Sequence, residues 1–407
     1  MDNQYDFAIV GGGILGIASA YQLQKKHPEK TIIVFEKDAV LAGHQTGNNS
    51  GVIHSGLYYK PGSKKAELCM KGKCDLVEFA KEYNVPHDLC GKVVVATKEK
   101  EIEVLERIYQ NGQANGCEGI EIIDGNQIKE KEPFVEGVKG IWVPTTGIID
   151  YRKMTEVMAE QIQRLNPASK ILTKHKVAKV EVINNQSVIK VNGSVFQANY
   201  VVFCGGLQAD KLAKKDNLKI DLKIVPFRGD YYDLTEKGMH KVKGLIYPVP
   251  DPDFPFLGVH FTRMVNGGVE CGPNAVFSFK REGYKRSDFS LSDSFDSLTY
   301  KGLWKLFGRH WKQGLEEYKR AYSKKLFLET LQKMIPSLEM DDIQPARAGV
   351  RAQALDMDGN LVYDFKIEEN GNHFHVLNAP SPAATACLSI GQYICDTVSD
   401  KVNYFDP

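Results

Sequence analysis

The stretch Phe7-Ala-Ile-Val-Gly-Gly-Gly-Ile-Leu-Gly16 decides the fold of this chain. Its apolar first part predicts a short buried strand, and the residues from about Leu15 to Lys26 predict the helix that follows. A second apolar run, Thr31–Phe35, predicts another buried strand, and Glu36 comes directly after it. This strand–helix–strand order is typical of the opening of a Rossmann-type α/β domain.

The glycines of this stretch have the spacing Gly11-x-Gly13-x-x-Gly16, between the strand and the helix. They permit a tight turn and let the backbone, as far as the helical residue Ile14, come close to a pyrophosphate. The helix N-terminus adds N–H donors and the positive end of the helix dipole. Glu36 can accept hydrogen bonds from an adenosine ribose. The pattern therefore predicts a dinucleotide site, and it fits both NAD and FAD.

The residues after Glu36 distinguish between these two cofactors. The segment His44–Tyr59, HQTGNNSGVIHSGLYY, is rich in small residues and amides. Such a composition indicates backbone that tracks along a long, extended cofactor, whereas an NAD domain usually continues from its second strand into another helix. We therefore expect FAD, with contacts from Lys37, Thr46, Asn49 and Ser50.

The overall composition argues against several other classes of protein. The chain has 52 Lys and Arg against 51 Asp and Glu, so it lacks the basic excess of a nucleic-acid-binding protein. Its eight cysteines form no CxxC pair and no zinc-like spacing with histidine, so we expect reduced thiols and no metal site. No apolar run reaches the roughly 18 residues that span a bilayer. The N-terminus leads into a strand without a signal sequence, which predicts a cytoplasmic protein.

The order of the expected elements indicates two domains, as the length of 407 residues also suggests. A helix over 151–165, a hairpin of Lys170–Ile183 and Ser187–Phe196, and a further buried strand Tyr200–Phe203 continue the α/β region. Short strand-like runs between about 220 and 275 predict an antiparallel sheet. We therefore predict a Rossmann-type α/β FAD-binding domain of residues 1–85, 148–215 and 340–407, and an α+β substrate domain of residues 86–147 and 216–339.

Two later segments complete the cofactor motifs. Strand Tyr200–Phe203 runs into a Cys-Gly-Gly turn, and the loop Asn378–Thr385, NAPSPAAT, precedes the last expected helix. Together with the earlier motifs, these segments resemble the glycine-oxidase and D-amino-acid-oxidase superfamily of flavoproteins. The resemblance implies that the backbone of Val177 meets the adenine and that Gly205 contacts the dinucleotide. It also implies that the pyrimidine end of the flavin is contacted by Ser381, Pro382, Ala383 and Ala384.

Longer motifs narrow the resemblance to one family. The runs HQTGNNSGVIHSG from His44, IVPFRGDY from Ile224, FLGVHFT from Phe256 and GVRAQALD from Gly349 are similar to L-2-hydroxyglutarate dehydrogenases, also called L-2-hydroxyglutarate oxidases. This resemblance implies oxidation of L-2-hydroxyglutarate to 2-oxoglutarate, with a hydride passing from C2 to flavin N5 and the electrons going on to a quinone or oxygen. From the residues alone, an amine or amino-acid oxidase of the same superfamily, or a flavin-binding protein without turnover, remain alternatives.

Two histidines are candidate bases for that reaction. Alternation along Phe256–Thr262 puts three apolar side chains on one face of a strand and His260 on the other, which we expect to face the active site. A neutral histidine there could accept the hydroxyl proton as the hydride leaves C2. His54 follows the flavin-tracking segment and is the second candidate, with a purely supporting role in its loop as the alternative. Tyr59 could line the same pocket or pack in the core.

Two arginines are candidate ligands for the carboxylates of the substrate. Arg351 matches a position where related flavoenzymes hold the acidic group of the substrate, and a guanidinium binds a carboxylate through two parallel hydrogen bonds. A structural ion pair with Asp356 or Asp358 is the alternative. Arg228 could bind the second carboxylate or pair with Asp230.

The segment Lys301–Lys325 has aromatic residues three or four apart, with basic residues between them. The pattern predicts one basic amphipathic helix. We expect its aromatic stripe to pack on the substrate domain. A peripheral contact with the cytoplasmic face of the inner membrane is the alternative, because a quinone would be reached there.

Overall fold

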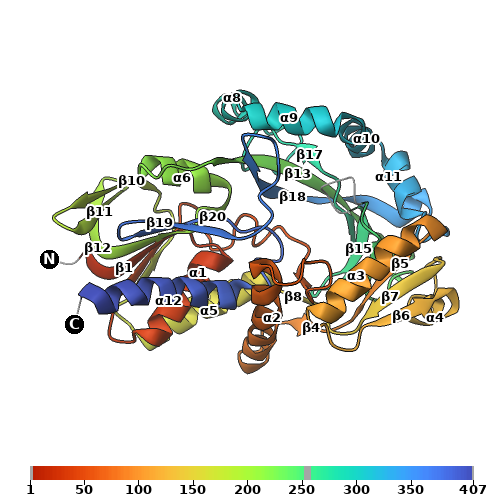
Figure 1. Ribbon diagram of the computed structural model, residues 1–407, viewed down its shortest axis with the longest axis horizontal. Coiled ribbons are helices and arrows are strands. Elements are labelled where there is room, and N and C mark those ends of the chain that lie inside the picture. Colours follow the sequence, from red (N-terminus) through yellow and green to blue (C-terminus); the bar gives the residue numbers. More distant parts are fainter. Residues whose placement is uncertain (1–2, 252–257, 406–407) are drawn as a thin grey trace.

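The computed structural model describes residues 3–251 and 258–405 of the chain. Figure 1 shows two groups of strands, one towards each end of the molecule, with both termini beside the first group. These strands form two large sheets. A third, small sheet consists of β3 (Val52–Ile53), β4 (His87–Asp88) and β8 (Gly147–Ile149).

The first sheet is built around β1 (Gln4–Val10), whose inner residues are buried as its apolar run requires. Parallel partners lie on both sides of β1, and a hairpin extends the sheet beyond β12. The other strands of this sheet are β2 (Ile32–Phe35), β9 (Lys170–Leu172), β10 (Val177–Ile183), β11 (Gln186–Val191), β12 (Ser194–Phe203), β19 (Lys366–Asn370) and β20 (His373–Asn378). Because several of them pair in parallel, their carboxyl ends meet at one edge, where a cofactor can bind.

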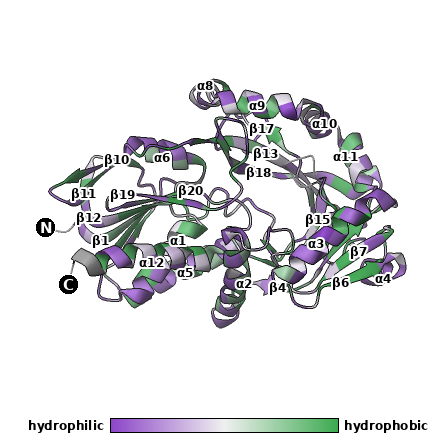
Figure 2. Ribbon diagram, in the orientation of Figure 1, coloured by the Kyte–Doolittle hydropathy of each residue, from purple (hydrophilic) through white to green (hydrophobic). Residues whose placement is uncertain are grey.

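Beside this sheet, α1 (Ile14–Lys26) contacts both α5 (Tyr151–Leu165) and α12 (Cys387–Phe405). Their apolar side chains share one core with the strands, in which Ile9, Ile17 and Met158 are fully buried. Two further helices complete this half, α2 (Lys64–Glu82) against α12 and α6 (Ala209–Lys215) beside β20. Figure 2 shows mainly hydrophobic residues on the strands near β1, whereas the helices are mixed.

The second sheet is mostly antiparallel and has its own core around Ile246, Phe261 and Phe327. Its strands are β5 (Lys92–Ala96), β6 (Glu121–Asp124), β7 (Lys139–Val143), β13 (Leu222–Leu234), β14 (Leu245–Pro248), β15 (His260–Arg263), β16 (Val269–Gly272), β17 (Val276–Phe277) and β18 (Ile343–Asp356). The helices of this half are α3 (Ile102–Ala114), α4 (Gly125–Lys131), α7 (Glu236–Met239), α8 (Leu291–Leu298), α9 (Lys301–Arg309), α10 (Trp311–Tyr322) and α11 (Lys324–Leu331).

The predicted fold class is confirmed, but both arms of the predicted hairpin need correction. The first arm, Lys170–Ile183, is divided into β9, which pairs in parallel with β2, and β10. The turn at Asn184 and Asn185 joins β10 and β11 with positive φ angles at both residues, as a tight two-residue hairpin turn requires. The predicted strand Ser187–Phe196, however, is interrupted by a second turn at Asn192-Gly193. The run Tyr200–Phe203 is therefore the second half of β12 rather than a separate strand, because the local apolar pattern does not record where a strand begins.

Two further predictions are wrong. Residues 343–356, predicted as part of the FAD-binding domain, form β18, which pairs along its length with β13 of the second sheet. The single helix predicted over Lys301–Lys325 is instead α9, α10 and the start of α11, because the chain leaves helical geometry at His310 and again at Ser323. The side chain of Ser323 then accepts the backbone N–H of Leu326 and caps the next helix.

Candidate active site

A cavity of about 1010 Å³ lies where the two sheets meet. Its walls include the carboxyl end of β1 and the loop after β2 from the first sheet. Residues of β13, β14, β15 and β18 contribute from the second sheet. A cavity shared in this way can hold a cofactor on one sheet and a substrate on the other.

The glycine motif shapes one end of this cavity, which we call the dinucleotide end. Gly11 has a φ of +118°, and a Cβ atom there would lie 2.4 Å from the carbonyl oxygen of Cys204. At Gly16 a Cβ atom would lie 2.0 Å from the carbonyl oxygen of Gly11. Gly13, the N-cap residue of α1, makes no side-chain capping hydrogen bond, and the first helical N–H, that of Ile14, donates to the hydroxyl of Thr46. The residues from Gly13 to Gly16 at the start of α1 line the cavity, as a pyrophosphate site requires.

Two backbone groups orient the carboxylate of Glu36 in this end. The N–H of Gly12 donates to Oε2 at 2.8 Å, and the N–H of Asp38 donates to Oε1 at 2.8 Å. Each carboxylate oxygen has further lone pairs. Glu36 also lines the cavity, so it is held ready to accept hydroxyl groups of a ribose.

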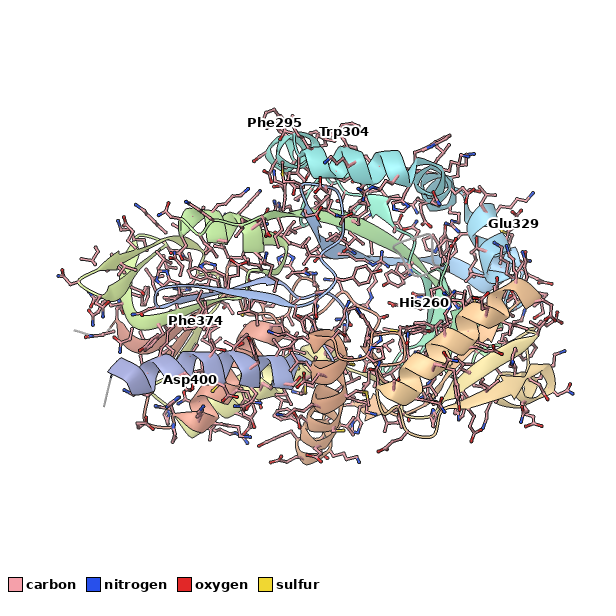
Figure 3. All side chains as sticks on the ribbon, viewed as in Figure 1. His260, Phe295, Trp304, Glu329, Phe374 and Asp400 are labelled. Carbon is pink, nitrogen blue, oxygen red and sulfur yellow. The ribbon has the colours of Figure 1, made fainter. Side chains whose placement is uncertain are left out.

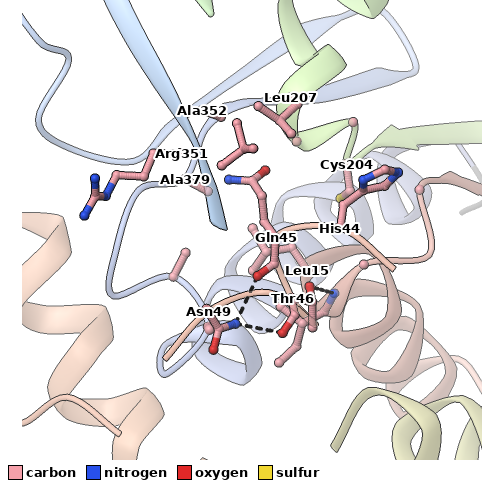
Figure 4. A pocket seen from close by; sticks show the side chains of 18 of the residues that line it. Leu15, His44, Gln45, Thr46, Asn49, Cys204, Leu207, Arg351, Ala352 and Ala379 are labelled. Atoms are coloured by element: carbon pink, nitrogen blue, oxygen red, sulfur yellow. Dashed lines mark hydrogen bonds between the residues drawn. The ribbon is translucent and has the colours of Figure 1, made fainter. Parts of the chain in front are cut away.

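The loop after β2 is fixed by its own side chains, and Figure 4 shows these bonds with Arg351 on the opposite side of the view. The hydroxyl of Thr46 accepts the N–H of Ile14 at 3.1 Å. The amide of Asn49 donates to the carbonyl oxygens of Gln45 at 3.1 Å and Thr46 at 2.7 Å. These contacts hold the loop against α1, and they leave its backbone along the cavity.

The residues predicted to bind the cofactor all line the cavity. Lys37 is less free than the sequence suggests, because its ammonium group contacts Asp38 at 2.8 Å and Glu282 at 3.0 Å. The complete set comprises Gly11, Gly13, Ile14, Gly16, Glu36, Lys37, Thr46, Asn49, Ser50, Val177, Gly205, Ser381, Pro382, Ala383 and Ala384.

His54 and His260 both line the other end of the cavity, which we call the substrate end. The ring Nε2 of His54 lies 3.2 Å from the hydroxyl of Ser381, and its backbone N–H donates to the hydroxyl of Thr385 at 3.1 Å. Burial, with smaller contributions from Lys92 and other neighbouring cations, lowers the pKa of His54 to about 3. His54 is therefore a neutral ring tied to the loop before α12.

The geometry of His260 fixes which ring nitrogen carries its proton. Nδ1 lies 3.0 Å from the carbonyl oxygen of Gly258, which can only accept, so Nδ1 donates and Nε2 keeps a lone pair. The ring stacks on Tyr247 with centroids 4.0 Å apart. Burial, together with Arg351 and Lys92, lowers the pKa of His260 to about 4. Part of the predicted strand, Phe256 and Leu257, lies outside the described residues.

Arg351 reaches the substrate end from β18, and its Nη1 donates to the carbonyl oxygen of Asn274 at 3.1 Å. The ion pair that the sequence offered as an alternative does not form. Asp356 accepts hydrogen bonds from the turn that follows it, and Asp358 pairs with Lys305 at 2.5 Å. Burial lowers the pKa of Arg351, which nevertheless keeps its charge as a guanidinium.

Arg228 and Tyr59 are not among the residues that line the cavity. Nε of Arg228 lies 3.0 Å from Oδ1 of Asp230, and Nη1 donates to the carbonyl oxygen of Lys285 at 3.2 Å. Both partners of this ion pair are buried, which fits the structural alternative rather than a substrate ligand. The ring of Tyr59 has its centre 5.5 Å from the ammonium group of Lys65.

Two lysines at the substrate end were missed by the sequence reasoning. Lys65 lines the cavity from the first turn of α2. Lys92 lies behind the wall at 1% exposure, with its ammonium group 4.6 Å from the ring centre of Tyr58 and 5.1 Å from that of Tyr247. A charged residue opening the buried strand KVVVA was the available signal for Lys92; Lys65 had none, because it lies in an ordinary polar stretch.

The described residues contain no group of three or more His, Cys, Asp and Glu side chains suited to a metal ion. No helix within 3–251 and 258–405 is long and apolar enough to cross a membrane.

The sequence and the fold of this chain are similar to those of known proteins. A family described as DAO, FAD dependent oxidoreductase, matches residues 6–397. An L-alpha-glycerophosphate oxidase from Mycoplasma pneumoniae with FAD bound has a TM-score of 0.79 at 22% identity, over 97% of this chain and 95% of that one. A glycine oxidase from Geobacillus kaustophilus has a TM-score of 0.72 at 15% identity, over 98% and 95%. Together with the start of α1 along the cavity and the oriented Glu36, these matches define an FAD-dependent oxidoreductase.

Curated relatives share more of the sequence. The L-2-hydroxyglutarate dehydrogenase of Indibacter alkaliphilus is 47% identical, over 96% of this chain and 98% of its own length. The mitochondrial L-2-hydroxyglutarate dehydrogenase of Homo sapiens is 43% identical, over 98% and 89%. That of Escherichia coli K12 is 42% identical, over 97% and 93%. The chain belongs to the L-2-hydroxyglutarate dehydrogenase family.

Proposed function

We propose that this protein oxidises L-2-hydroxyglutarate to 2-oxoglutarate. The observation that carries the proposal is the positive charge at the substrate end, which Lys65 and Arg351 supply beside the neutral rings of His54 and His260. Among the described lining residues, the acidic ones are Glu36, Asp38, Glu282 and Asp293, and their partners belong to the dinucleotide end. A desolvated cationic end suits a substrate with two carboxylates. The curated relatives with this activity in their names support the same substrate.

His260 is the general base in this proposal. Its Nε2 carries the lone pair and accepts the proton of the C2 hydroxyl. The charge of Arg351 contributes to lowering the pKa of His260, which indicates that the two side chains are close. Arg351 holds the C1 carboxylate, next to C2, by charge-assisted hydrogen bonds. Bound FAD supplies the acceptor for the hydride that leaves C2. His54 supports the flavin-binding loop through Ser381.

The same proposal assigns the cofactor contacts. The backbone between Gly11 and Gly16 and the N-terminus of α1 hold the diphosphate. Glu36 accepts the ribose hydroxyls, and the backbone of Val177 meets the adenine. The loop of Ser381 to Ala384 contacts the pyrimidine end of the flavin.

Anaerobic mixing of the purified protein with each enantiomer of 2-hydroxyglutarate tests this function. We expect L-2-hydroxyglutarate to bleach the flavin absorbance rapidly, with one 2-oxoglutarate formed per flavin, and the D enantiomer to leave it oxidised. Glycine, sarcosine and lactate serve as controls from the neighbouring substrate classes. If any of them reduces the flavin as fast as L-2-hydroxyglutarate does, the proposed substrate is wrong.

We also propose that the electrons pass to a membrane quinone, with oxygen as the weaker acceptor, and that the protein docks on the cytoplasmic face of the inner membrane. Figure 1 shows α8, α9 and α10 in a row along the outer edge of the second half, and Figure 3 shows Phe295 and Trp304 at this edge. Phe295 is 73% exposed, Trp304 58% and Trp311 60%. Exposed lysines, among them Lys301 and Lys312, lie between these aromatic residues. Aromatic side chains among basic ones suit a surface of anionic lipids.

Flotation with vesicles of anionic phospholipid tests the docking surface. Replacing Trp304 and Trp311 together by serine should release the protein from the vesicles and slow the reduction of a lipid-soluble quinone. Replacing Val182, which is 56% exposed on β10 of the first sheet, by serine is the matched control and should change neither property. Vesicle binding that survives the double replacement would contradict this surface.

A further inference from the structure

Lys65 holds a charge in a position where a lysine is unfavourable. It is the second residue of α2, at the positive end of the helix dipole, where cations are disfavoured. Burial lowers its pKa to about 8. The charge of Lys65 also contributes to lowering the pKa of His54, which places the two side chains near each other. Two destabilising effects, the helix dipole and burial, therefore act on one ammonium group.

Nothing in the described part of the chain neutralises this group. No carboxylate there forms an ion pair with Lys65, although many other lysines have one. The charge of Asp364 raises the pKa of Lys65 in part, but Asp364 forms no ion pair with it, and its carboxylate accepts the N–H of Phe365 at 2.9 Å. The rings of Tyr59 and Tyr363 flank the ammonium group, each with its centre 5.5 Å away. These rings keep the side chain in place, and cation–π contacts offset a part of the lost hydration.

The position of Lys65 in the cavity indicates which kind of ligand it can bind. Lys65 and Arg351 both line the substrate end, one from α2 and the other from β18. The charge of Arg351 contributes to lowering the pKa of His260, whereas the charge of Lys65 contributes to lowering the pKa of His54. The two cations thus approach the substrate end from different elements, beside different histidines. Such an arrangement suits a ligand with an anionic group at each end.

We propose that Lys65 binds the C5 carboxylate of the substrate, the group that distinguishes 2-hydroxyglutarate from monocarboxylic 2-hydroxy acids. This inference rests on the proposed function and adds the residue that sets its specificity. Arg228, which the sequence offered for this carboxylate, is occupied by Asp230 outside the cavity wall. Binding of the carboxylate would restore to Lys65 the anionic partner that the chain itself does not supply. Without that carboxylate a ligand leaves a desolvated charge unpaired, which is costly.

The experiment compares Lys65→Met with Lys64→Met in the FAD-loaded enzyme. Lys64 is the neighbouring exposed lysine, whose ammonium group lies 3.3 Å from the hydroxyl of Tyr393 on α12. The substrates are L-2-hydroxyglutarate and L-2-hydroxyvalerate, which has the same number of carbons and no C5 carboxylate. We expect Lys65→Met to lower kcat/KM for hydroxyglutarate by about 10- to 100-fold, the worth of a charge-assisted hydrogen bond. The value for hydroxyvalerate should stay the same or rise, and Lys64→Met should change neither value.

Equilibrium binding separates this inference from the proposed function. Glutarate and butyrate, which cannot be oxidised at C2, are titrated into the oxidised enzyme while the flavin spectrum is followed. Lys65→Met should weaken the binding of glutarate by a similar factor and leave butyrate unchanged, and Lys65→Arg should recover most of the loss. An unchanged preference for hydroxyglutarate in a folded, FAD-loaded Lys65→Met enzyme would overturn the role of Lys65 while the proposed function stands. If wild type binds glutarate through Lys65 but does not oxidise hydroxyglutarate, the proposed function fails and the dicarboxylate site remains.

Discussion

Replacing Glu317 by alanine should impair turnover, although Glu317 lies outside the cavity. Glu317 is on α10 and is buried beneath the outer surface. Its Oε2 accepts the backbone N–H of Ala275 at 2.9 Å. The preceding residue, Asn274, offers the carbonyl oxygen that accepts Nη1 of Arg351 at 3.1 Å. Glu317 therefore positions, through a single peptide unit, the acceptor that orients Arg351.

The size of the effect follows from the buried hydrogen bond. Alanine leaves the N–H of Ala275 without its acceptor, which costs about 1–3 kcal/mol for a buried donor. If the interaction of Arg351 with the substrate is weakened by the same free energy, kcat/KM for L-2-hydroxyglutarate falls by about 5- to 150-fold. Small displacements of a binding group are enough for changes of that size. We expect the loss mainly as a raised KM, because the role proposed for Arg351 is to bind the substrate carboxylate both before and during the reaction.

The assay pairs Glu317→Ala with Glu317→Gln. The amide oxygen of glutamine can still accept the N–H of Ala275, so this variant should keep most of the activity even though it loses the charge that acts on Arg320 and Arg351. Flavin content and unfolding temperature are measured alongside, so that a general loss of folding is recognised. A Glu317→Ala enzyme with normal KM, or a glutamine variant as impaired as the alanine variant, would refute this reasoning.

Three further perturbations test the rest of the site. Glu36→Ala should weaken FAD binding by about 10- to 100-fold because the ribose loses a charged acceptor, and dialysis followed by the flavin absorbance measures it; unchanged occupancy would contradict the role. Arg351→Met should lower kcat/KM for hydroxyglutarate steeply with normal flavin content, and an equal loss with neutral substrates would instead indicate a folding defect. Lys92→Met removes a positive charge that acts on His260 together with Arg351, so the pKa of His260 should rise from about 4. Because the base works in its neutral form, the acid limb of the pH profile of kcat/KM should then move to higher pH. Lys92→Arg, which keeps the charge, should leave the acid limb in place. An acid limb that does not move in Lys92→Met would exclude this coupling between Lys92 and His260.

Local sequence patterns were sufficient for the cofactor half of the site. The run from Phe7 to Gly16 carries its own strand, turn and helix start, and Glu36 follows the next strand. Each of these features depends on neighbours along the chain, so spacing predicts them. The loop of Ser381 to Ala384 was found through its resemblance to a family, and it too lines the cavity.

The substrate half depended on contacts between distant segments, which spacing does not record. The sequence offered Asp230 and a substrate carboxylate as equal partners for Arg228. Asp230 is two residues away on β13, but the carbonyl oxygen of Lys285, which also accepts from the Arg228 guanidinium, belongs to a distant segment. Similarly, Lys65 and Arg351 are far apart in the chain and meet at one cavity because α2 and β18 approach it from different sides.

The sequence by itself thus determined the class of fold, the FAD cofactor and the family. It could do so because strand, turn and helix signals are local and because long motifs identify relatives. Tertiary structure decided which nitrogen of His260 is free, where β18 belongs and which cations share the substrate end. Those properties arise from burial and from hydrogen bonds across the fold, and burial is set by the whole packed chain rather than by any one segment.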